Sequence, residues 1–313
     1  MRYKIAFCGL GSIAKRHLKN VCDYLANRGD DCEVDLYRSS LDKPLPVDIS
    51  LLVANQYLFV CEVEQNYDVV FITNPTSLHY ETLRKFKAHT KSFFIEKPVF
   101  DSTDIDESIF DALEGITCYV ACPLRYNPVL QYVKEHINFK AVISARAISS
   151  SYLPDWRPGQ DYRQCYSAHR DMGGGVGIDL IHEWDYLTSF FGIPERCYTI
   201  QDKVSNLEID SDDIAIYIAK AGRTTIELHL DYYGRQSART LELYTNDNTI
   251  RCDLINGAVT YLNRGETVVM DFDRNHYQMA EIEHFFDIIE GKIENDSTTE
   301  HAFAVLKLAK GEQ

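Results

Sequence analysis

Basic residues are scarce in this sequence. Lys and Arg number 32 against 47 Asp and Glu among 313 residues, which gives a formal net charge of −15. Because this sign repels phosphate groups, we expect neither nucleic acid nor an anionic membrane as a partner. No stretch approaches the roughly 20 apolar residues of a membrane-spanning helix. Any anionic substrate must therefore be bound by local arginines and lysines.

Paired cysteine motifs are also absent. None of the nine cysteines forms a CxxC pair, and several lie in apolar runs, as Cys8, Cys118 and Cys122 do. We therefore expect reduced thiols, a cytoplasmic location and no metal site. A hydrophobic content of 45% over this length is enough for two domains with sizeable cores.

The most informative segment that is present lies near the N-terminus. Residues 3–7 form a β-rich apolar run, Gly9-Leu10-Gly11-Ser12-Ile13-Ala14 opens a helical stretch through residue 25, and residues 33–37 indicate a second strand. In such a βαβ unit the first glycine permits a tight turn and the second lets the backbone approach a pyrophosphate at the helix N-terminus. The pattern predicts a dinucleotide-binding site.

The end of the second strand bears on which dinucleotide binds. NAD-binding domains favour a carboxylate there, whereas this chain has Tyr37-Arg38-Ser39-Ser40. Arg38 offers a fork of donors to a 2′-phosphate and Ser39 adds a hydroxyl, so we predict NADP, with NAD as a possibility. The alternatives are that Arg38 stacks on the adenine, or that Asp35 or Asp42 reaches the ribose.

A third motif follows an apolar strand at residues 93–100, which read FFIEKPVF. A buried ammonium such as that of Lys97 is costly unless it is paired or its pKa falls, which suits a proton-transfer group. Pro98 restricts the backbone of Lys97, and the bond between them can be cis. The alternative is an ordinary loop start.

The order of the predicted elements divides the chain in two. Residues 1–122 alternate strands and helices, which predicts a doubly wound parallel sheet with its ligand at the carboxyl ends of the strands. Residues 123–313 carry several β-rich runs with short turns, which predicts an open, largely antiparallel sheet. We expect helices at 277–290 and 300–310, with Phe285, Phe286 and Ile289 in a core. The fold class is α/β.

Within the second part, residues 171–187 combine a glycine run with HEWDYL. A helix from Gly177 would place Leu180, Trp184, Leu187 and Phe191 on an apolar stripe and Asp179, His182, Glu183 and Tyr186 on the other side. Asp179, three residues before His182, could then orient or charge its imidazole for acid–base work. The alternative is a structural histidine.

A loop at residues 152–163 is the candidate substrate contact. Trp156 and Tyr162 could stack on a sugar face, and Arg157, Arg163 and Arg170 are local cations for a carboxylate or diphosphate. We predict an acidic or nucleotide-linked sugar. The alternative is a solvated loop with incidental arginines.

Several motifs, taken in order along the chain, resemble those of the Gfo/Idh/MocA oxidoreductases. They are GLGSIA with Lys15-Arg16-His17, TNPTSLHYETL, EKPV, the Arg125-Tyr126-Asn127-Pro128 segment and GGG…HEWDYL. The resemblance implies a Rossmann domain, and a second domain whose open sheet carries the substrate and often a dimer interface. It implies that the cofactor is held by Gly9, Gly11, Ser12, Ile13, Asn74, Pro75, His79, Glu96 and Lys97. It also implies that Lys97 and His182 are catalytic and that Arg125 and Tyr126 contact substrate. Many members carry the acid four residues before the histidine, where this chain has Ile178.

We therefore expect an NADP(H)-dependent oxidoreductase that acts on a secondary alcohol or ketone of a sugar-like small molecule, plausibly in cell-surface polysaccharide synthesis. We expect a homodimer or homotetramer formed through the C-terminal sheet. Two alternatives stay open, a non-catalytic nucleotide sensor on the same fold and a reductase of non-sugar carbonyls or dihydrodiols.

Overall fold

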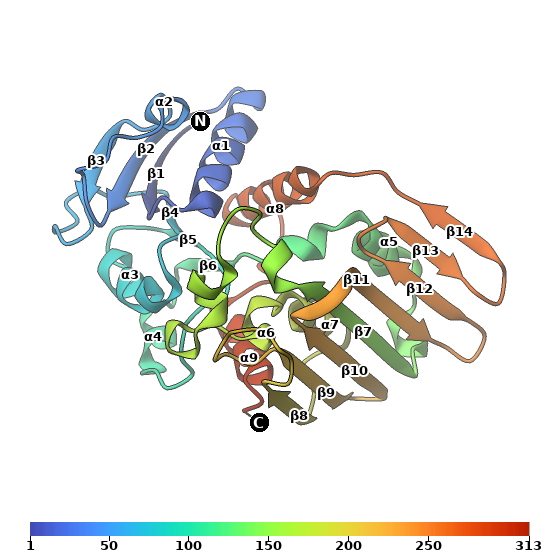
Figure 1. The fold of residues 1–313 in the computed structure, drawn as a ribbon. Coiled ribbons are helices and arrows are strands. Elements are labelled where there is room, and N and C mark those ends of the chain that lie inside the picture. The colour runs from blue at the N-terminus through green and yellow to red at the C-terminus, as the bar shows by residue number, and fades with distance from the viewer. Residues whose placement is uncertain (313) are drawn as a thin grey trace. The chain divides into compact units, whose positions relative to one another are not determined.

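A computed structural model describes residues 1–312, which form two compact units (Figure 1). Unit 1 comprises Met1–Pro123 and Arg274–Phe303, and unit 2 comprises Leu124–Asp273 and the segment that starts at Ala304. The first boundary lies within one residue of the expected one. The expected second domain, however, is not continuous, because residues 274–303 belong to unit 1.

Unit 1 is built on a six-stranded parallel sheet in the order β3-β2-β1-β4-β5-β6, which confirms the doubly wound prediction. Its strands are β1 Arg2–Cys8, β2 Asp31–Arg38, β3 Asn55–Leu58, β4 Val69–Ile72, β5 Ser92–Ile95 and β6 Thr117–Val120. The strand order reverses at β1, which lies between β2 and β4. In open α/β sheets the ligand crevice lies at this switch point, beyond the carboxyl ends of the strands.

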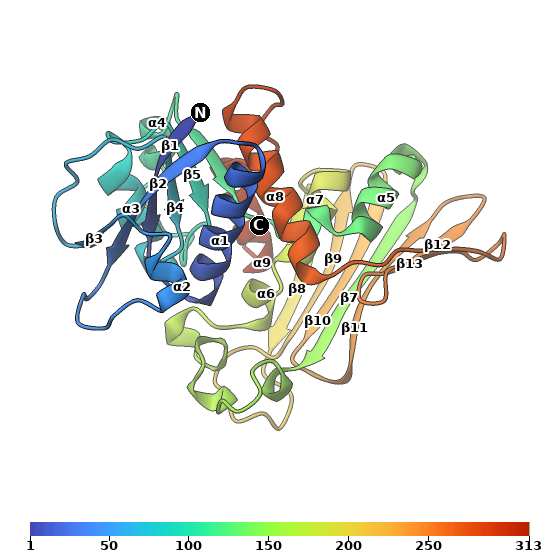
Figure 2. The ribbon, with the colours of Figure 1, turned by 90° about the horizontal axis from the view of Figure 1, so that it is seen from above.

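Helices cover both faces of the sheet in unit 1 (Figure 2). Helices α1 (Ser12–Asn27) and α8 (Arg274–Ile289) share one face, and α3 (His79–Phe86) lies on the other. Leu18 and Val21 of α1 pack with Phe285 and Phe286 of α8 in the core, where Ile289 lies at the margin. These apolar contacts explain why α8 belongs to unit 1 although it follows most of unit 2 in sequence.

Two shorter helices complete unit 1, α2 (Val47–Ser50) and α4 (Ser108–Ala112). The carboxylate of Asp106 accepts a hydrogen bond from the backbone N–H of Ser108 at 3.0 Å, a local turn that competes with helix in the preceding residues.

Unit 2 is built on an eight-stranded sheet in the order β14-β13-β12-β11-β7-β10-β9-β8. Its strands are β7 Ser144–Tyr152, β8 Arg196–Asp202, β9 Ile214–Ala221, β10 Thr224–Asp231, β11 Tyr233–Tyr244, β12 Thr249–Asp253, β13 Ala258–Tyr261 and β14 Glu266–Val269. Only β7 and β10 pair in parallel among these strands, so the largely antiparallel prediction is confirmed. The sequence reasoning missed β8 and β14.

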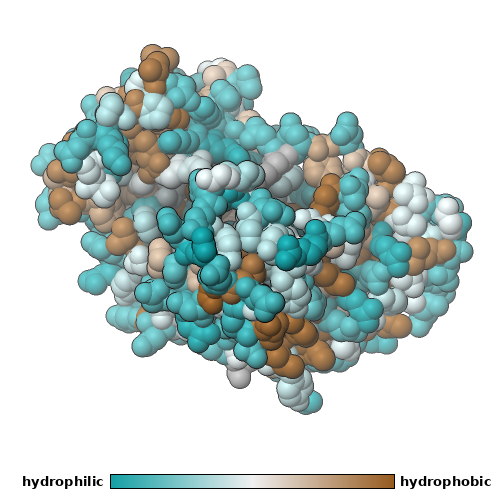
Figure 3. Space-filling view, viewed as in Figure 1, coloured by the Kyte–Doolittle hydropathy of each residue, from teal (hydrophilic) through white to brown (hydrophobic). Residues whose placement is uncertain are grey.

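One face of this sheet is covered and the other is open. Helices α5 (Pro128–His136) and α7 (His182–Phe191) lie on the covered face (Figure 2), near the short α6 (Val176–Asp179). Helix α9 (Thr299–Ala309) begins in unit 1 and continues in unit 2. On the open face, Tyr198, Ile200 and Ile218 are 73%, 65% and 53% exposed. Figure 3 shows hydrophobic residues gathered over this end of the sheet.

None of the helices within residues 1–312 combines the length and apolar character of a membrane span.

Candidate functional site

The loop between β1 and α1 has the geometry of a phosphate-binding turn. Gly9 has a φ of +96°, and a Cβ atom there would lie 2.7 Å from Cα of Asn74, so both conformation and space require glycine. Gly11 precedes α1 in extended conformation, and a Cβ there would meet open space. Ser12 is exposed and the first turn of α1 carries no acid. This helix N-terminus therefore suits a diphosphate.

Asn74 and Pro75 follow β4, next to this loop. Nδ2 of Asn74 donates to the hydroxyl of Thr82 at 2.8 Å, but its buried Oδ1 has no hydrogen-bond partner. A buried acceptor left unmatched is costly, which fits a ligand that brings a donor. The residues around Gly9 thus fit the dinucleotide expected from the sequence.

The end of β2 offers fewer groups to a ribose than the sequence alone suggests. Asp35 is fully buried, and its carboxylate accepts from Nδ2 of Asn55 at 2.8 Å and from the hydroxyl of Tyr67 at 3.0 Å. It is therefore not available to a ribose. Arg38 donates to Oε1 of Gln56 at 2.9 Å, and Ser39 beside it is exposed.

Glu96 and Lys97 follow β5 directly. Oε1 of Glu96 lies 2.5 Å from Nε2 of the buried His17 on α1, and the Lys97–Pro98 bond is cis. Burial alone would raise the pKa of Glu96. The hydrogen bond with His17 and the positive charges of His17 and Lys97 outweigh burial and hold this pKa below its usual range. Glu96 is thus an anion beside Lys97, and the role of His17 as its partner was missed.

His79 is buried at the start of α3. Its Nε2 lies 3.1 Å from the carbonyl oxygen of Asn74 and its Nδ1 lies 3.2 Å from that of Val99. Burial lowers the pKa of the imidazole, so the ring is neutral at pH 7. The side chain therefore braces the loops after β4 and β5, and its position relative to a cofactor remains a prediction.

The helix expected from Gly177 through Phe191 is interrupted, which corrects the prediction. Helix α6 ends at Asp179, Leu180 has φ −97° and ψ 27°, and α7 begins at His182. Asp179 and His182 therefore do not share one helix face. The expected polar side of α7 is also wrong, because Glu183 and Tyr186 are as buried as Trp184. Glu183 is buried with a partner, since Nε of Arg239 donates to it at 2.6 Å.

Asp179 lies among aromatic side chains of unit 2. Its carboxylate accepts a hydrogen bond from the hydroxyl of Tyr232 at 2.5 Å. Burial, then the charge of Asp179 and the hydrogen bond to it, raise the pKa of Tyr166 and of Tyr232. Trp156 packs edge-on against Tyr232, with ring centroids 5.3 Å apart. The sequence reasoning missed both tyrosines, because Tyr166 lies in no motif and Tyr232 lies 53 residues from Asp179.

The loop arginines differ in their partners. Arg163 donates to Asp161 at 2.8 and 3.0 Å and to Glu208 at 2.9 Å, and Arg170 donates to Asp212 at 2.8 Å. These two side chains are therefore already neutralised by acids. Arg157 instead lies over the ring of Tyr166, 5.5 Å from its centroid, and has no ion pair with any acid in the described part of the chain.

Arg125, an expected substrate contact, has an acidic partner. Its Nε and one terminal nitrogen each lie 2.6 Å from a carboxylate oxygen of Asp185, in a bidentate ion pair buried within unit 2. The guanidinium thus joins the segment before α5 to α7, and its contact with a substrate stays a prediction. Tyr126, the neighbouring substrate prediction, is half-buried.

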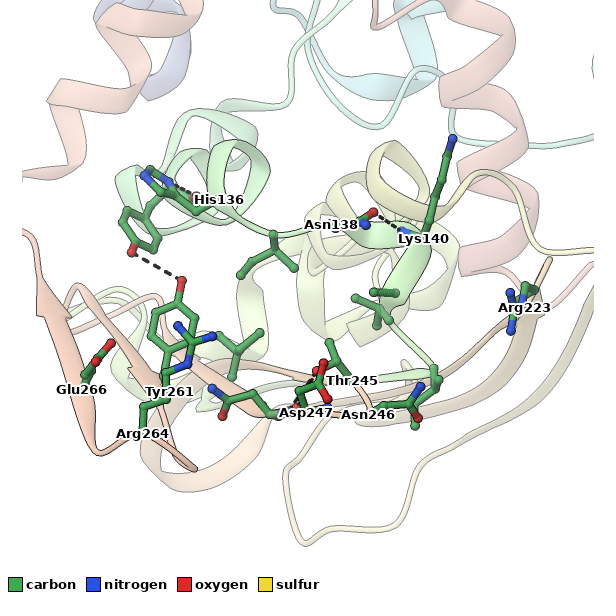
Figure 4. Close-up of a pocket in the computed structure, with 17 residues that line it drawn as sticks. His136, Asn138, Lys140, Arg223, Thr245, Asn246, Asp247, Tyr261, Arg264 and Glu266 are labelled. Carbon is green, nitrogen blue, oxygen red and sulfur yellow. Dashed lines mark hydrogen bonds between the residues drawn. The ribbon is translucent and has the colours of Figure 1, made fainter.

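A cavity of about 700 Å³ lies elsewhere in unit 2, beside α5 and the turns that follow β11 and β13 (Figure 4). None of the predicted site residues lines it. Its cationic side chains do not converge, since Lys140, Arg223 and Arg264 lie apart around the cavity in Figure 4. The cavity is therefore a poor candidate for an anion site.

Residues 3–120 match the Gfo/Idh/MocA family model, described as the oxidoreductase family with an NAD-binding Rossmann fold. D-xylose 1-dehydrogenase (NADP(+)) 2 of Haloferax volcanii is 25% identical over 244 residues, which are 72% of this chain and 71% of that protein.

Solved structures share the fold over nearly the whole chain. UDP-N-acetylglucosamine 3-dehydrogenase from Acidithiobacillus ferrooxidans has a TM-score of 0.77 at 18% identity, with 99% of this chain and 96% of that one covered. Levoglucosan dehydrogenase in complex with NADH and levoglucosan has a TM-score of 0.81 at 15% identity, with 100% and 98% covered. Residues 3–120 thus resemble the nucleotide-binding domain of the Gfo/Idh/MocA oxidoreductases, and the chain shares its fold with these two dehydrogenases.

Proposed function

We propose that the protein is an NADP(H)-dependent oxidoreductase that transfers hydride between the nicotinamide and a secondary alcohol or ketone of a sugar-like substrate. One observation within unit 1 carries this proposal. Gly9, Asn74 and Lys97 follow β1, β4 and β5, three adjacent strands whose carboxyl ends lie at one edge of the sheet. A phosphate-binding turn, an unmatched acceptor and an ammonium group thus meet where a dinucleotide binds in this fold.

The residues of the chain have separate tasks in this proposal. When bound, the nicotinamide gives or accepts the hydride. Lys97 and His182 move the hydroxyl proton of the substrate, as general acids or bases do at positioned oxygens. Glu96, held by His17, keeps a negative charge beside Lys97. Asp179 is held by Tyr232 in the same unit as His182.

We propose NADP over NAD because the end of β2 offers cations and hydroxyls and no accessible carboxylate at Asp35. Arg38 and Ser39 lie there at the surface or near it. The similarity to a xylose dehydrogenase named for NADP(+) supports the same preference.

The finer proposal is a nucleotide-linked or acidic sugar of cell-surface polysaccharide synthesis. Arg157 supports it as a cation without an acidic partner among the described residues, next to Tyr166 and Trp156, two aromatic surfaces suited to a sugar face. The similarity in fold to a UDP-N-acetylglucosamine dehydrogenase points the same way.

The test is a screen that follows absorbance of the reduced nicotinamide with NADP(+) and NAD(+). The panel contains D-xylose, myo-inositol, UDP-N-acetylglucosamine and a UDP-sugar bearing a carboxylate. We expect turnover with at least one UDP-sugar, faster with NADP(+). Tight NADPH binding without turnover of any polyol or sugar would instead favour a nucleotide sensor.

We also propose that two copies of the chain associate through the open face of the sheet in unit 2. Tyr198, Ile200 and Ile218 form an exposed apolar cluster on neighbouring strands β8 and β9, since Tyr198 pairs with Ile218. Apolar surface of this kind is stabilised by burial against a partner.

A further inference from the structure

Two cysteines of unit 1 lie close together outside the residues discussed so far. Cys22 on α1 and Cys32 on β2 have their Sγ atoms 3.7 Å apart. Both side chains are half-buried at the margin of the core formed by α1, α8 and the sheet, so small solutes can reach them. Among the cysteines within residues 1–312, all nine carry free thiols.

The thiol of Cys32 donates a hydrogen bond to Sγ of Cys22. This contact lowers the pKa of Cys32, whereas the same contact, and then burial, raises the pKa of Cys22. A thiol with a lowered pKa has more of the nucleophilic thiolate near neutral pH. A second thiol within reach can then resolve an oxidised first one.

We propose that Cys22 and Cys32 are a site of reversible oxidation that forms an intrachain disulfide with oxidants of the peroxide class. The Cys32 thiolate attacks one peroxide oxygen, which breaks the O–O bond, leaves a sulfenic acid on Cys32 and releases water after protonation. The thiol of Cys22 then attacks that sulfur, the S–S bond forms, and the sulfenic oxygen leaves as a second water. The peroxide is reduced and two thiols are oxidised, with two hydrogens lost from the protein.

The position of the pair predicts the consequence. Cys32 pairs with Tyr3 at the start of β1, whereas the nucleotide loop follows Cys8 at its far end. The disulfide would therefore join α1 to β2 without entering the Gly9 loop. The proposal does not depend on the proposed function, and NADPH affinity should be unchanged by oxidation.

The full-length protein is treated with graded hydrogen peroxide, alkylated and digested with trypsin, which cuts after Arg28 between the two cysteines. We expect the peptides 20–28 and 29–38 to appear as one cross-linked species, lighter by about 2 Da than their sum. Dithiothreitol should restore both free peptides, and the NADPH dissociation constant should change less than twofold.

Cys61, which is exposed and has no neighbouring thiol among the described residues, is the matched control. Cys61→Ser should leave the cross-link intact, and Cys32→Ser should abolish it. The wild-type digest is decisive even if a variant fails to fold. Full alkylation of Cys22 and Cys32 at a peroxide dose that oxidises Cys61 would overturn the proposal, as would a cross-link of either one to a different cysteine.

Discussion

The side chains around Lys97 come from more than its own sequence motif, so the motif alone does not predict them. The carboxylate of Glu96 precedes it, and that carboxylate is fixed at 2.5 Å by a buried imidazole from α1. A charged acid held in this way fixes the local electric field beside Lys97. We therefore propose that Glu96 supports Lys97, in addition to any contact with a cofactor.

The pH dependence of stability follows from the pKa of Glu96. A carboxylate with a lowered folded pKa stabilises the protein above its unfolded value, near 4.5, and this contribution is lost as the pH falls through the folded value. We expect Glu96→Gln to be less stable than wild type in urea at pH 7, with the difference shrinking below pH 4.5. Exposed Glu62→Gln is the control. A difference that stays constant with pH would contradict this assignment.

Arg38 carries the cofactor preference at the residue scale. We expect Arg38→Asp to weaken NADPH binding relative to NADH by roughly 1–3 kcal/mol, the scale of a charge-assisted phosphate contact. Titration of both cofactors into both proteins measures the change. Equal affinities for NADPH and NADH in the wild type would remove the basis of the NADP proposal.

At the scale of elements, the segment from Gly177 to Phe191 shows that hydrophobic periodicity predicts which side chains are buried but does not predict where a helix is interrupted. The buried positions of Leu180, Trp184 and Leu187 were predictable, because they recur at helical spacing. The break at Leu180 was not, since no proline or glycine marks it. The partners of Asp179 were equally hidden, because Tyr166 and Tyr232 come from distant segments.

In the remaining elements too, features set by local sequence were predictable and features set by distant residues were not. The glycine turn and the doubly wound parallel sheet of unit 1 followed from local patterns with known geometry. The edge strand β8 was missed because its side chains alternate between partly and fully exposed positions and include Arg196 and Asp202 at its ends. The ion pairs of the loop arginines were hidden in part, because Glu208 and Asp212 lie about 40 residues from Arg163 and Arg170, whereas Asp161 lies two residues from Arg163.

The loop after β7 gives an element-scale prediction with an internal control. If Arg157 binds the anionic part of the substrate, Arg157→Ala should raise KM or lower kcat/KM about tenfold, the scale of one charge-assisted hydrogen bond, with an unchanged NADPH dissociation constant. Arg163→Ala should have a smaller effect, because Asp161 and Glu208 already occupy its guanidinium. A larger kinetic loss in Arg163→Ala would reverse the two roles.

At the scale of the whole molecule, the open face of unit 2 predicts the oligomeric state. We expect light scattering to give a dimer or tetramer for the wild type and a smaller assembly for Ile218→Lys, because a buried lysine in an apolar interface is costly. Ile293→Lys alters an exposed isoleucine of unit 1 and is the control. A monomeric wild type, or an unchanged mass for Ile218→Lys, would contradict the proposed interface.

The whole chain combines a nucleotide-binding unit with a second unit that carries His182, and we propose that Lys97 transfers the substrate proton. The most direct measurement is kcat of Lys97→Met with the best substrate of the screen, beside Lys91→Met, an exposed lysine just before the same strand. We expect kcat of Lys97→Met to fall by about 10²–10⁴ with an unchanged NADPH dissociation constant, and Lys91→Met to match the wild type. Near wild-type turnover by Lys97→Met would contradict the account.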